Sequence, residues 1–388
     1  MPKLQSDCER SRLPLVSILR EWGRIGCVGF GGPPAHIALL RDLCVTRRRW
    51  IEPDEFEDAI AATNLVPGPA STQLAIYCAW RLRGVAGALV GAAGFILPGL
   101  VLILALAALF LADSPPAWVI GAGAGAGAAV AAVAIHATAG LIPASWSRAP
   151  VRARWLGYVL VGTAAAATVG AWLVLVLLAC GLLEVALRSG VAGSLGAHLW
   201  PVFAVNDPAI GGLPALAWVA LKVGALSYGG GFVIIPLMQD DAVHTYQWMT
   251  DGQFLNAVAL GQITPGPVVQ TVAAVGYAAA GLGGGLLAAF VAFAPSIAII
   301  LLGAKRFDRL RGNATVRAFL DGAGPAAIGG IAGSAIPLAL ALSEGWQVAV
   351  LAAAVALLLV ARRGVVLTLM VAGACGVVAS IAGAPLPQ

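Results

Sequence analysis

The sequence predicts an all-α polytopic membrane protein built from two homologous halves in an inverted-topology repeat. Of its 388 residues, 60% are hydrophobic and 11% are charged, and the mean hydropathy is +0.91. Because an ordinary soluble domain carries about 25% charged residues, a soluble globular fold is excluded. Apolar runs at 85–112, 118–142 and 365–384 are close to or above the roughly 20 residues that a helix needs to cross a hydrocarbon core.

An internal duplication is the second observation behind this fold class. Trp50 reappears as Trp248, an offset of 198 residues, and the same offset maps Pro67-Gly68-Pro69 onto Pro265-Gly266-Pro267 and Gly87 onto Gly285. Composition bias can match alanines and glycines, but it does not place two tryptophans and two Pro-Gly-Pro triplets in one register. The chain is therefore divided into an N-terminal repeat at 1–188, a linker at 189–213 that could form a weak crossing, and a C-terminal repeat at 214–388.

Each half is expected to contain six apolar or glycine-broken helical segments. They lie near 14–32, 54–82, 85–112, 117–142, 154–171 and 172–187 in the first half, and near 214–230, 252–280, 283–303, 322–342, 346–361 and 364–384 in the second. With the linker, we expect about ten to thirteen transmembrane segments, some of them broken or re-entrant.

The charges of the connecting loops predict opposite orientations for the two halves, because short basic loops stay on the cytoplasmic side. Where the first half has Arg47–Arg49 and Arg148, the second half has Asp240 and Glu344, and only the second half has a basic loop at 305–317. Such complementary loops are typical of secondary transporters with inverted repeats, whose binding site lies near the bilayer midplane. A basic loop at Arg47 beside a basic N-terminus also requires the first segment to re-enter, or the Pro-Gly-Pro segments to count differently.

The two Pro-Gly-Pro triplets predict breaks in membrane helices. Proline removes a backbone donor and pushes the preceding residue away from helical angles, so the helix must stop and restart. A half-helix that begins at Pro69 or Pro267 would present free amides and the positive end of its dipole, which is a ready anion site. A kink that serves packing alone is the alternative, and a matched pair in inverted repeats argues against it.

Glycines and polar side chains around the breaks complete the predicted substrate-binding site. Gly31-Gly32 and Gly229-Gly230 allow either close packing or a turn whose amides bind an anion. The residues assigned to the site are Arg24, Gly31, Gly32, Asn64, Pro67, Gly68, Pro69, Ser71, Thr72, Gln73, Lys222, Gly229, Gly230, Gln262, Thr264, Pro265, Gly266, Pro267 and Gln270.

Arg24 and Lys222 occupy the same position in the two repeats. A cation inside a membrane is costly and usually functional, so the pair is predicted to face the anion path, with snorkelling to the interface as the alternative. His36 has no counterpart, since Ile234 stands at the equivalent place, and it is assigned a structural role. The alternating Gly-Ala run at 121–127 is predicted to pack helices closely.

Residue counts argue against several other classes of function. None of the three lysines follows a glycine, which excludes a Walker A loop, and neither HExxH nor Gly-x-Ser-x-Gly occurs. The six cysteines are scattered without a CxxC, so neither a zinc site nor a disulfide framework is indicated. Since no nucleophile–base or metal constellation is visible, we expect no catalytic site, no metal and no cofactor. The net charge of +5 is spread over short loops, which predicts no nucleic-acid partner.

The motifs at 30–36, 65–73, 222–231 and 262–267 resemble those of the chromate ion transporter family in its long, two-domain form. The resemblance covers essentially the whole chain, although Tyr228 stands where the family motif usually has Phe. It implies efflux of chromate from the cytoplasm across the inner (plasma) membrane, giving chromate resistance, with sulfate as a similar tetrahedral dianion that competes. Moving a dianion outward down an inside-negative potential gains about 4.6 kcal/mol per 100 mV, so no ATPase is required.

Three alternatives stay open. A carrier of sulfate or another oxyanion is the main one. A non-transporting membrane scaffold or sensor is the second, although packing needs neither two broken helices nor matched cations. A membrane-embedded enzyme is the third. The lipid bilayer is the partner that the composition requires, whereas the coupling ion and the oligomeric state, a homodimer included, stay open.

Thiol labelling tests the opposite orientation of the halves. Single cysteines at Thr46 and Thr245, placed in a chain without the native cysteines, should react with an impermeant reagent from opposite faces of the membrane. Reaction of both cysteines from one face would rule out the inverted repeat.

Overall fold

The computed structural model describes residues 13–64, 66, 68–112, 115–168, 173–189, 211–227, 234–304 and 313–387. Within these ranges the chain forms helices and turns, without a strand. Three of the assigned site residues, Pro67, Gly229 and Gly230, and most of the predicted linker lie outside the described residues.

The helices of the N-terminal repeat are α2 (Leu15–Val28), α3 (Pro33–Arg41), α4 (Pro53–Thr63), α5 (Ala70–Phe110), α6 (Ala117–Ala128), α7 (Val130–Arg148), α8 (Arg152–Thr168) and α9 (Leu173–Ser189). Those of the C-terminal repeat are α10 (Leu213–Leu226), α11 (Ile234–Gln239), α12 (Asp251–Ile263), α13 (Thr271–Gly303), α15 (Ala314–Leu340), α16 (Gly345–Val355) and α17 (Val365–Ile381). Short π-helical turns at Asp42–Arg47, Asp240–Thr245 and Ala356–Val360 extend α3, α11 and α16.

Four stretches of helix in the described residues are long and apolar enough to cross a membrane. They are Ala70–Phe110, Ala117–Arg148, Val268–Gly303 and Ala314–Leu340. Three shorter apolar helices, at Leu213–Leu226, Gly345–Val360 and Val365–Ile381, accompany them. A helical, multi-pass membrane protein is therefore confirmed.

The first four helices form two hairpins that enter the molecule and turn back. Arg48, which follows α3, pairs with Glu21 of α2, and the rings of Trp22 and Trp50 stack with centroids 6.4 Å apart. Glu55 at the start of α4 likewise pairs with Arg81 of α5. The predicted segment 54–82 thus returns to the end at which it begins, and α3 carries the chain back from the tip at the end of the predicted segment 14–32. These two hairpins do not traverse the bundle, so the number of crossings stays a prediction.

Both long helices contain a sharp reversal. In α5 it lies at Arg83 and Gly84, where Gly84 has a φ of 59°, and in α13 it lies at Ala280 and Gly281, where Gly281 has a φ of 62°. A left-handed φ is accessible to glycine at little cost. After each reversal the returning limb passes close to the carbonyl of the incoming one, at Gly87 in α5 and at Gly284 in α13.

These reversals correct one detail of the predicted repeat register. Gly84 and Gly87 correspond to Gly281 and Gly284, an offset of 197 residues, so the mapping of Gly87 onto Gly285 was wrong by one residue. The reason is a tight 3-10 turn at Val268–Gln270, which replaces the first helical turn that follows Pro69 in α5. Such a turn takes 3.0 residues rather than 3.6. The shorter register makes Gln73 the counterpart of Gln270.

The returning limbs of α5 and α13 pack against each other in opposite directions. Gly99, in the middle of the α5 limb, lies against the carbonyl of Pro265 and the side chain of Gln270, where α13 begins. Gly285, just after the reversal in α13, lies against Leu104, which is further along α5. The start of one limb is therefore near the end of the other.

Glycines set the closest helix contacts. Gly26 of α2 lies against the backbone of Gly94 and Phe95 in α5, and Gly224 of α10 lies against the backbone of Ala292 in α13. Helices without an intervening Cβ can approach until their backbones touch, which maximises dispersion contacts where lipid offers no hydrophobic driving force.

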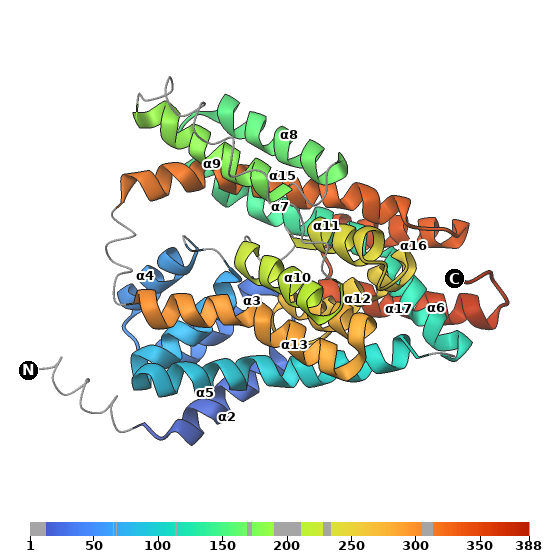
Figure 1. Ribbon diagram of the computed structural model, residues 1–388, viewed down its shortest axis with the longest axis horizontal. Helices are drawn as coiled ribbons and strands as arrows, with labels where there is room; N and C mark the ends of the chain where they lie inside the picture. Colours follow the sequence, from blue (N-terminus) through green and yellow to red (C-terminus); the bar gives the residue numbers. More distant parts are fainter. Residues whose placement is uncertain are drawn as a thin grey trace, which may run out of the picture.

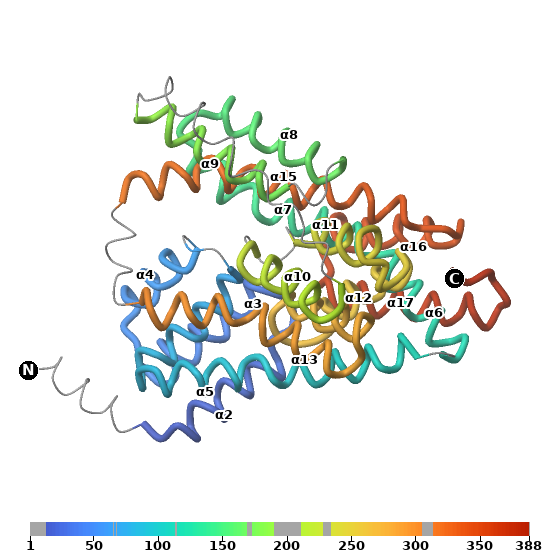
Figure 2. The backbone as a smooth tube through the Cα atoms, in the orientation of Figure 1, coloured from blue at the N-terminus to red at the C-terminus, as the bar shows by residue number. Residues whose placement is uncertain are grey.

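A second group of helices packs beside this core. Figure 1 and the tube in Figure 2 show α8, α9 and α15 on one side of the molecule, α2, α5 and α13 on the other, and α10 and α12 between them. In the 121–127 run, Gly121 and Gly125 face α17 at Gly376, whereas Gly123 and Gly127 face α12 at Asn256. The predicted role of this run in close helix packing is confirmed.

The contact of Gly224 with Ala292 yields a stability prediction. A Cβ at Gly224 would overlap the carbonyl of Ala292, so Gly224→Ala should lower the free energy of unfolding by about 1–3 kcal/mol. Gly283→Ala is the matched control, because that position lies in α13 with open space around it. Thermal unfolding of the detergent-solubilised variants measures the difference, and equal melting temperatures would contradict the close approach.

Candidate functional site

The tips of three hairpins meet inside the molecule. The amide of Gly266, in the second Pro-Gly-Pro triplet, donates to the carbonyl of Gly29 at the end of α2, with an N···O distance of 3.0 Å. His36 of α3 reaches the same carbonyl with Nε2 at 2.9 Å, and its Nδ1 lies 3.2 Å from Oγ of Ser71 in the first turn of α5. The backbone groups of one non-helical segment are thus hydrogen-bonded to those of another.

His36 is fully buried, and its ring meets the edge of Phe95 with centroids 5.0 Å apart. Since the carbonyl of Gly29 can only accept, Nε2 donates to it, and Nδ1 of a neutral imidazole then accepts from the hydroxyl of Ser71. The predicted structural role of His36 is therefore a specific one, which is to join the first tip to the start of α5. Its place close after Gly31-Gly32 in the first motif was the sequence signal for that contact.

The first break separates α4 from α5. Helix α4 ends at Thr63, Gly68 has a φ of 114°, and α5 begins at Ala70 with Pro69 as its N-cap. The amides of Thr72 and Gln73 donate to the carbonyl of Pro69 at 2.9 and 3.0 Å. The amides that precede them in the first turn have no helical carbonyl to reach, and they point out of the start of the helix.

Buried hydroxyl groups surround this break. Gly68 lies against the side chain of Gln73 and against Oγ of Ser296, which comes from α13 of the other repeat. Within the described part of the chain, Oγ1 of Thr72 and Oγ of Ser296 are buried without a hydrogen-bond partner. A buried hydroxyl in that state costs free energy unless a water or a substrate completes it.

The second break has a matching construction but is packed shut. Helix α12 ends at Ile263, Gly266 has a φ of 105°, and Pro267 precedes the 3-10 turn before α13. Gln270 lies against Gly266 as Gln73 lies against Gly68, and its Nε2 donates to the carbonyl of Ile96 at 2.8 Å. Thr264, Pro265, Gly266 and Pro267 are all buried.

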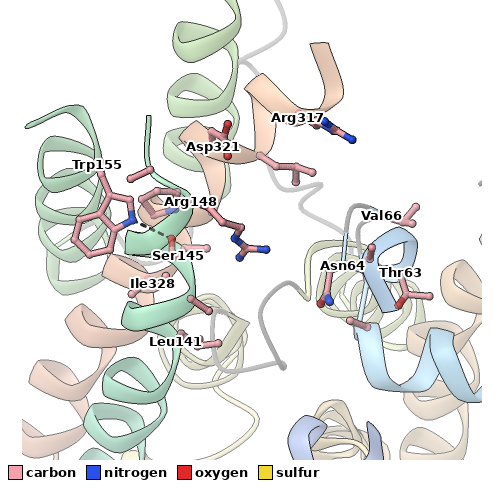
Figure 3. Close-up of a pocket in the computed structure, with 18 of the residues that line it drawn as sticks. Thr63, Asn64, Val66, Leu141, Ser145, Arg148, Trp155, Arg317, Asp321 and Ile328 are labelled. Atoms are coloured by element: carbon pink, nitrogen blue, oxygen red, sulfur yellow. Dashed lines mark hydrogen bonds between the residues drawn. The ribbon is translucent and has the colours of Figure 1, made fainter. Parts of the chain in front are cut away.

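The first break borders a cavity. The cavity has a volume of about 600 Å³ and lies between the first break, the C-terminal half of α7 and the first half of α15 (Figure 3). Its lining includes Thr63, Asn64, Val66 and Gly68 from the break, Leu141, Ser145 and Arg148 from α7, Trp155 from α8, and Arg317, Asp321, Gly324 and Ile328 from α15.

The matched cations have different surroundings. Lys222 is mostly buried and pairs with the fully buried Asp241, its Nζ lying 2.9 and 3.0 Å from the two carboxylate oxygens. The repeat places Leu43 where the second half has Asp241, and Arg24 is exposed on α2. A shared role for the two cations on an anion path stays a prediction.

The structure therefore brings together part of the predicted site. Asn64 and Gly68 line the cavity, and Ser71, Thr72 and Gln73 lie directly behind them in α5. Gln262 is buried at the end of α12, and Gly31 and Gly32 have left-handed φ values at the first tip. By sequence, Arg148 and Arg317 belong to the basic loops that indicate orientation, and neither is among the predicted site residues. The packing of α7 and α15 against the break brings both to the cavity.

The contact between His36 and Ser71 yields a prediction. His36→Ala leaves the hydroxyl of Ser71 without its ring partner and leaves the carbonyl of Gly29 with the amide of Gly266 alone, and Ser71→Ala removes the hydroxyl donor to the ring. A double-mutant cycle in thermal or denaturant unfolding should give a coupling of about 0.5–1.5 kcal/mol. Additive effects of the two substitutions would show that the hydrogen bond does not hold the tips together.

Comparison with known proteins follows the same division of the chain. The family model described as "Chromate transporter" matches residues 16–185 and again residues 214–378. The chromate transport protein of Cupriavidus metallidurans is 32% identical over 333 residues, covering 81% of this chain and 80% of that protein. The chromate transport protein of Pseudomonas aeruginosa is 29% identical over 342 residues, covering 83% and 80%.

The other comparisons complete this picture. A probable chromate transport protein of Synechococcus elongatus is 28% identical over 330 residues, covering 81% of this chain and 82% of that protein. No solved structure matches significantly. Because the family model covers most of the chain in two regions and a curated relative exceeds 30% identity over four-fifths of it, this chain belongs to the chromate transporter family.

Proposed function

We propose that the chain is a secondary transporter that exports chromate from the cytoplasm across the inner membrane and thereby gives chromate resistance. The observation that carries this proposal is the cavity of about 600 Å³ that ends on the first Pro-Gly-Pro break. There the start of α5 offers amides, its dipole and buried hydroxyl groups to a small anion. Relatives with printed roles in chromate transport support chromate as the substrate.

The two repeats, at 1–188 and 214–388, are proposed to sit in opposite orientations, joined by the linker at 189–213. The antiparallel packing of the returning limbs of α5 and α13 supports this orientation, because these limbs are equivalent elements of the two repeats. The complementary loop charges support it independently. The two breaks then approach the middle of the membrane from opposite sides, as in other transporters with inverted repeats.

Alternating access is the proposed mechanism, and the unequal state of the two breaks supports it. Gly125 of α6 lies against the backbone of α17, and Gly322 of α15 lies in the same way against α9. This pairing makes α6 and α15 equivalent helices, again with an offset of 197 residues. Gly123 and Gly127 of α6 then correspond to Leu320 and Gly324 of α15.

The equivalent faces of α6 and α15 differ in their surroundings, since the face of α6 is covered and the face of α15 is open. Asn256 and Leu255 of α12 cover Gly123 and Gly127, whereas Leu320 and Gly324 line the cavity opposite α4. Closing α4 onto α15 while α12 leaves α6 would exchange the two arrangements. A substrate held at the breaks would then pass from one side to the other without a continuous channel.

Loop charge gives the proposed direction. Arg148 and Arg317 lie at the end of the cavity where α7 finishes and α15 starts, and their loops belong to the basic set that the positive-inside rule assigns to the cytoplasm. The described state is therefore open toward the cytoplasm. Exit of a dianion toward the positive side of the membrane is favourable without ATP.

Lipid is proposed to cover the apolar outer faces of the long helices. Large apolar side chains there are strongly exposed, among them Phe290 and Leu302 of α13 and Leu340 of α15. Such exposure would promote aggregation in water, but it matches the acyl chains of a bilayer.

Transport by proteoliposomes tests the function and the role of the breaks. Pro69→Ala and Pro267→Ala let each helix continue, since alanine is the better helix former, and they should lower chromate flux at least tenfold. Pro143→Ala is the matched control, because Pro143 is an exposed proline inside α7 that does not line the cavity. Flux should rise with an imposed potential that is positive on the receiving side.

Each other outcome has a definite meaning. Near-native flux in both break variants would make the breaks packing features and place the site elsewhere. Native flux of sulfate with no flux of chromate would make the chain a sulfate carrier. Absence of flux for chromate, sulfate and molybdate in a folded wild-type protein would favour a scaffold or sensor.

A further inference from the structure

We propose that Ser296 of α13 contacts the substrate, so that the C-terminal repeat contributes a hydrogen-bond donor to the oxyanion site at the first break. The inference rests on the proposed function and deepens it, because Ser296 lies outside the motifs that the two repeats share. Its ligand is a small oxyanion, whose oxygens accept hydrogen bonds from a neutral hydroxyl.

Ser296 lies against the first break from the opposite repeat. It is fully buried in α13, and a Cβ at Gly68 would lie 2.9 Å from its Oγ. Gly68 also lines the cavity. Because Gly68 has no side chain, the Ser296 hydroxyl lies next to the backbone that borders the cavity, close to the start of α5.

The hydroxyl of Ser296 has no hydrogen-bond partner within the described part of the chain. Three other buried hydroxyls on helices behave differently, since each donates to a carbonyl of its own helix. They belong to Thr63, Thr138 and Ser334, with O···O distances of 2.9, 2.9 and 2.7 Å. A serine inside a helix makes such a bond readily, so a hydroxyl buried without one costs free energy unless a ligand or a water accepts a hydrogen bond from it.

The first repeat shows that the contact itself does not need a hydroxyl. With the offset of 197 residues that the two reversals set, Ser296 corresponds to Gly99, and each follows a proline inside its helix. Gly99 lies against the second break, at the carbonyl of Pro265. Equivalent positions thus face the break of the opposite repeat in both halves. A glycine packs against the closed break, and a serine packs against the break that borders the cavity.

The same difference recurs in the first turn after each break. Ser71 and Thr72 lie in the first turn of α5, whereas the 3-10 turn before α13 has Val268 and Val269. The hydroxyl of Ser71 is bonded to His36, but Oγ1 of Thr72 is buried without a partner among the described residues. Packing is satisfied by valine and glycine at the second break, so the hydroxyls at the first break serve binding.

These groups would hold an oxyanion from two sides. The amides in the first turn of α5 and the positive end of its dipole attract the anion, and the hydroxyls of Thr72 and Ser296 each donate one hydrogen bond to an oxygen. Since these two hydroxyls belong to opposite repeats, the full set of donors exists only while the repeats keep the present arrangement. A relative movement of the repeats would release the anion.

The experiment measures chromate binding to the purified full-length protein in detergent, by titration calorimetry and by the rise in melting temperature that chromate causes. Ser296→Ala removes the hydroxyl alone and should raise the dissociation constant of chromate about tenfold. Because that hydroxyl has no partner in the described part of the protein, the melting temperature without chromate should stay the same or rise, while the gain caused by chromate becomes smaller. Thr72→Val should weaken binding in the same way.

Ser334→Ala is the matched control. Ser334 is equally buried, in α15, but its hydroxyl already donates to the carbonyl of Ile331 and it does not line the cavity. This variant should have a lower melting temperature without chromate and an unchanged affinity for chromate. A Ser296→Ala protein that behaves like this control, or like the wild type, would overturn the inference.

Flux in proteoliposomes separates this result from failure of the proposed function. A wild type that binds chromate without moving it would overturn transport, and weaker binding by Ser296→Ala would still support the contact. If the wild type binds only sulfate or molybdate, the same comparison with that anion decides the inference. A folded wild type that binds none of the three anions would overturn the contact and the proposed function together.

Discussion

Everything in this structure depends on one constraint, which is that backbone leaving a helix inside a membrane must still find hydrogen-bond partners. The molecule meets it by bringing broken segments together. The carbonyl of Gly29 receives the amide of Gly266 and the ring of His36, and that ring in turn reaches Ser71 at the start of α5. The polar groups at each tip thus find their hydrogen-bond partners at another tip. Unwound backbone that would be unstable in contact with lipid is instead enclosed within the protein.

Close packing makes that meeting possible. Glycines at the contacts of α2 with α5 and of α10 with α13 allow backbone to touch backbone, which holds four hairpin arms around two antiparallel limbs. The two halves use equivalent contacts, but they are not in the same state. The second break is buried, with α12 packed against α6, and the first break borders a cavity. The proposed transport cycle is the exchange of these two states.

Much of the fold could be predicted because it follows from local chemistry. Proline interrupts a helix, so the prolines at 67–69 and 265–267 predict the ends of α4 and α12. The same signal occurs in both repeats, which strengthens the prediction. The alignment of the two repeats was harder to predict. The second repeat forms a 3-10 turn at Val268–Gln270 and is one residue shorter there, although both Pro-Gly-Pro triplets are intact. That turn moved the partner of Gly87 from Gly285 to Gly284.

The site was harder to predict, because its members meet through long-range packing. Nothing near Arg148 in the sequence indicates that α15 and the first break will face it across a cavity. Arg24 and Lys222 have different surroundings for a similar reason, since Leu43 stands in the first repeat where the second has Asp241, the buried partner of Lys222. Matched positions predict matched backbone, but side-chain environment depends on neighbours that the repeat does not preserve.

Blocking the cavity tests the central claim most directly. A single cysteine at Leu320, on the cavity wall, is treated with a bulky impermeant thiol reagent from the face that carries Arg148, in a chain without native cysteines. The account predicts that complete modification stops chromate flux and that chromate slows the modification, whereas a cysteine at the outward-facing Leu302 does neither. Undiminished flux through protein fully modified at position 320 would contradict a path through this cavity.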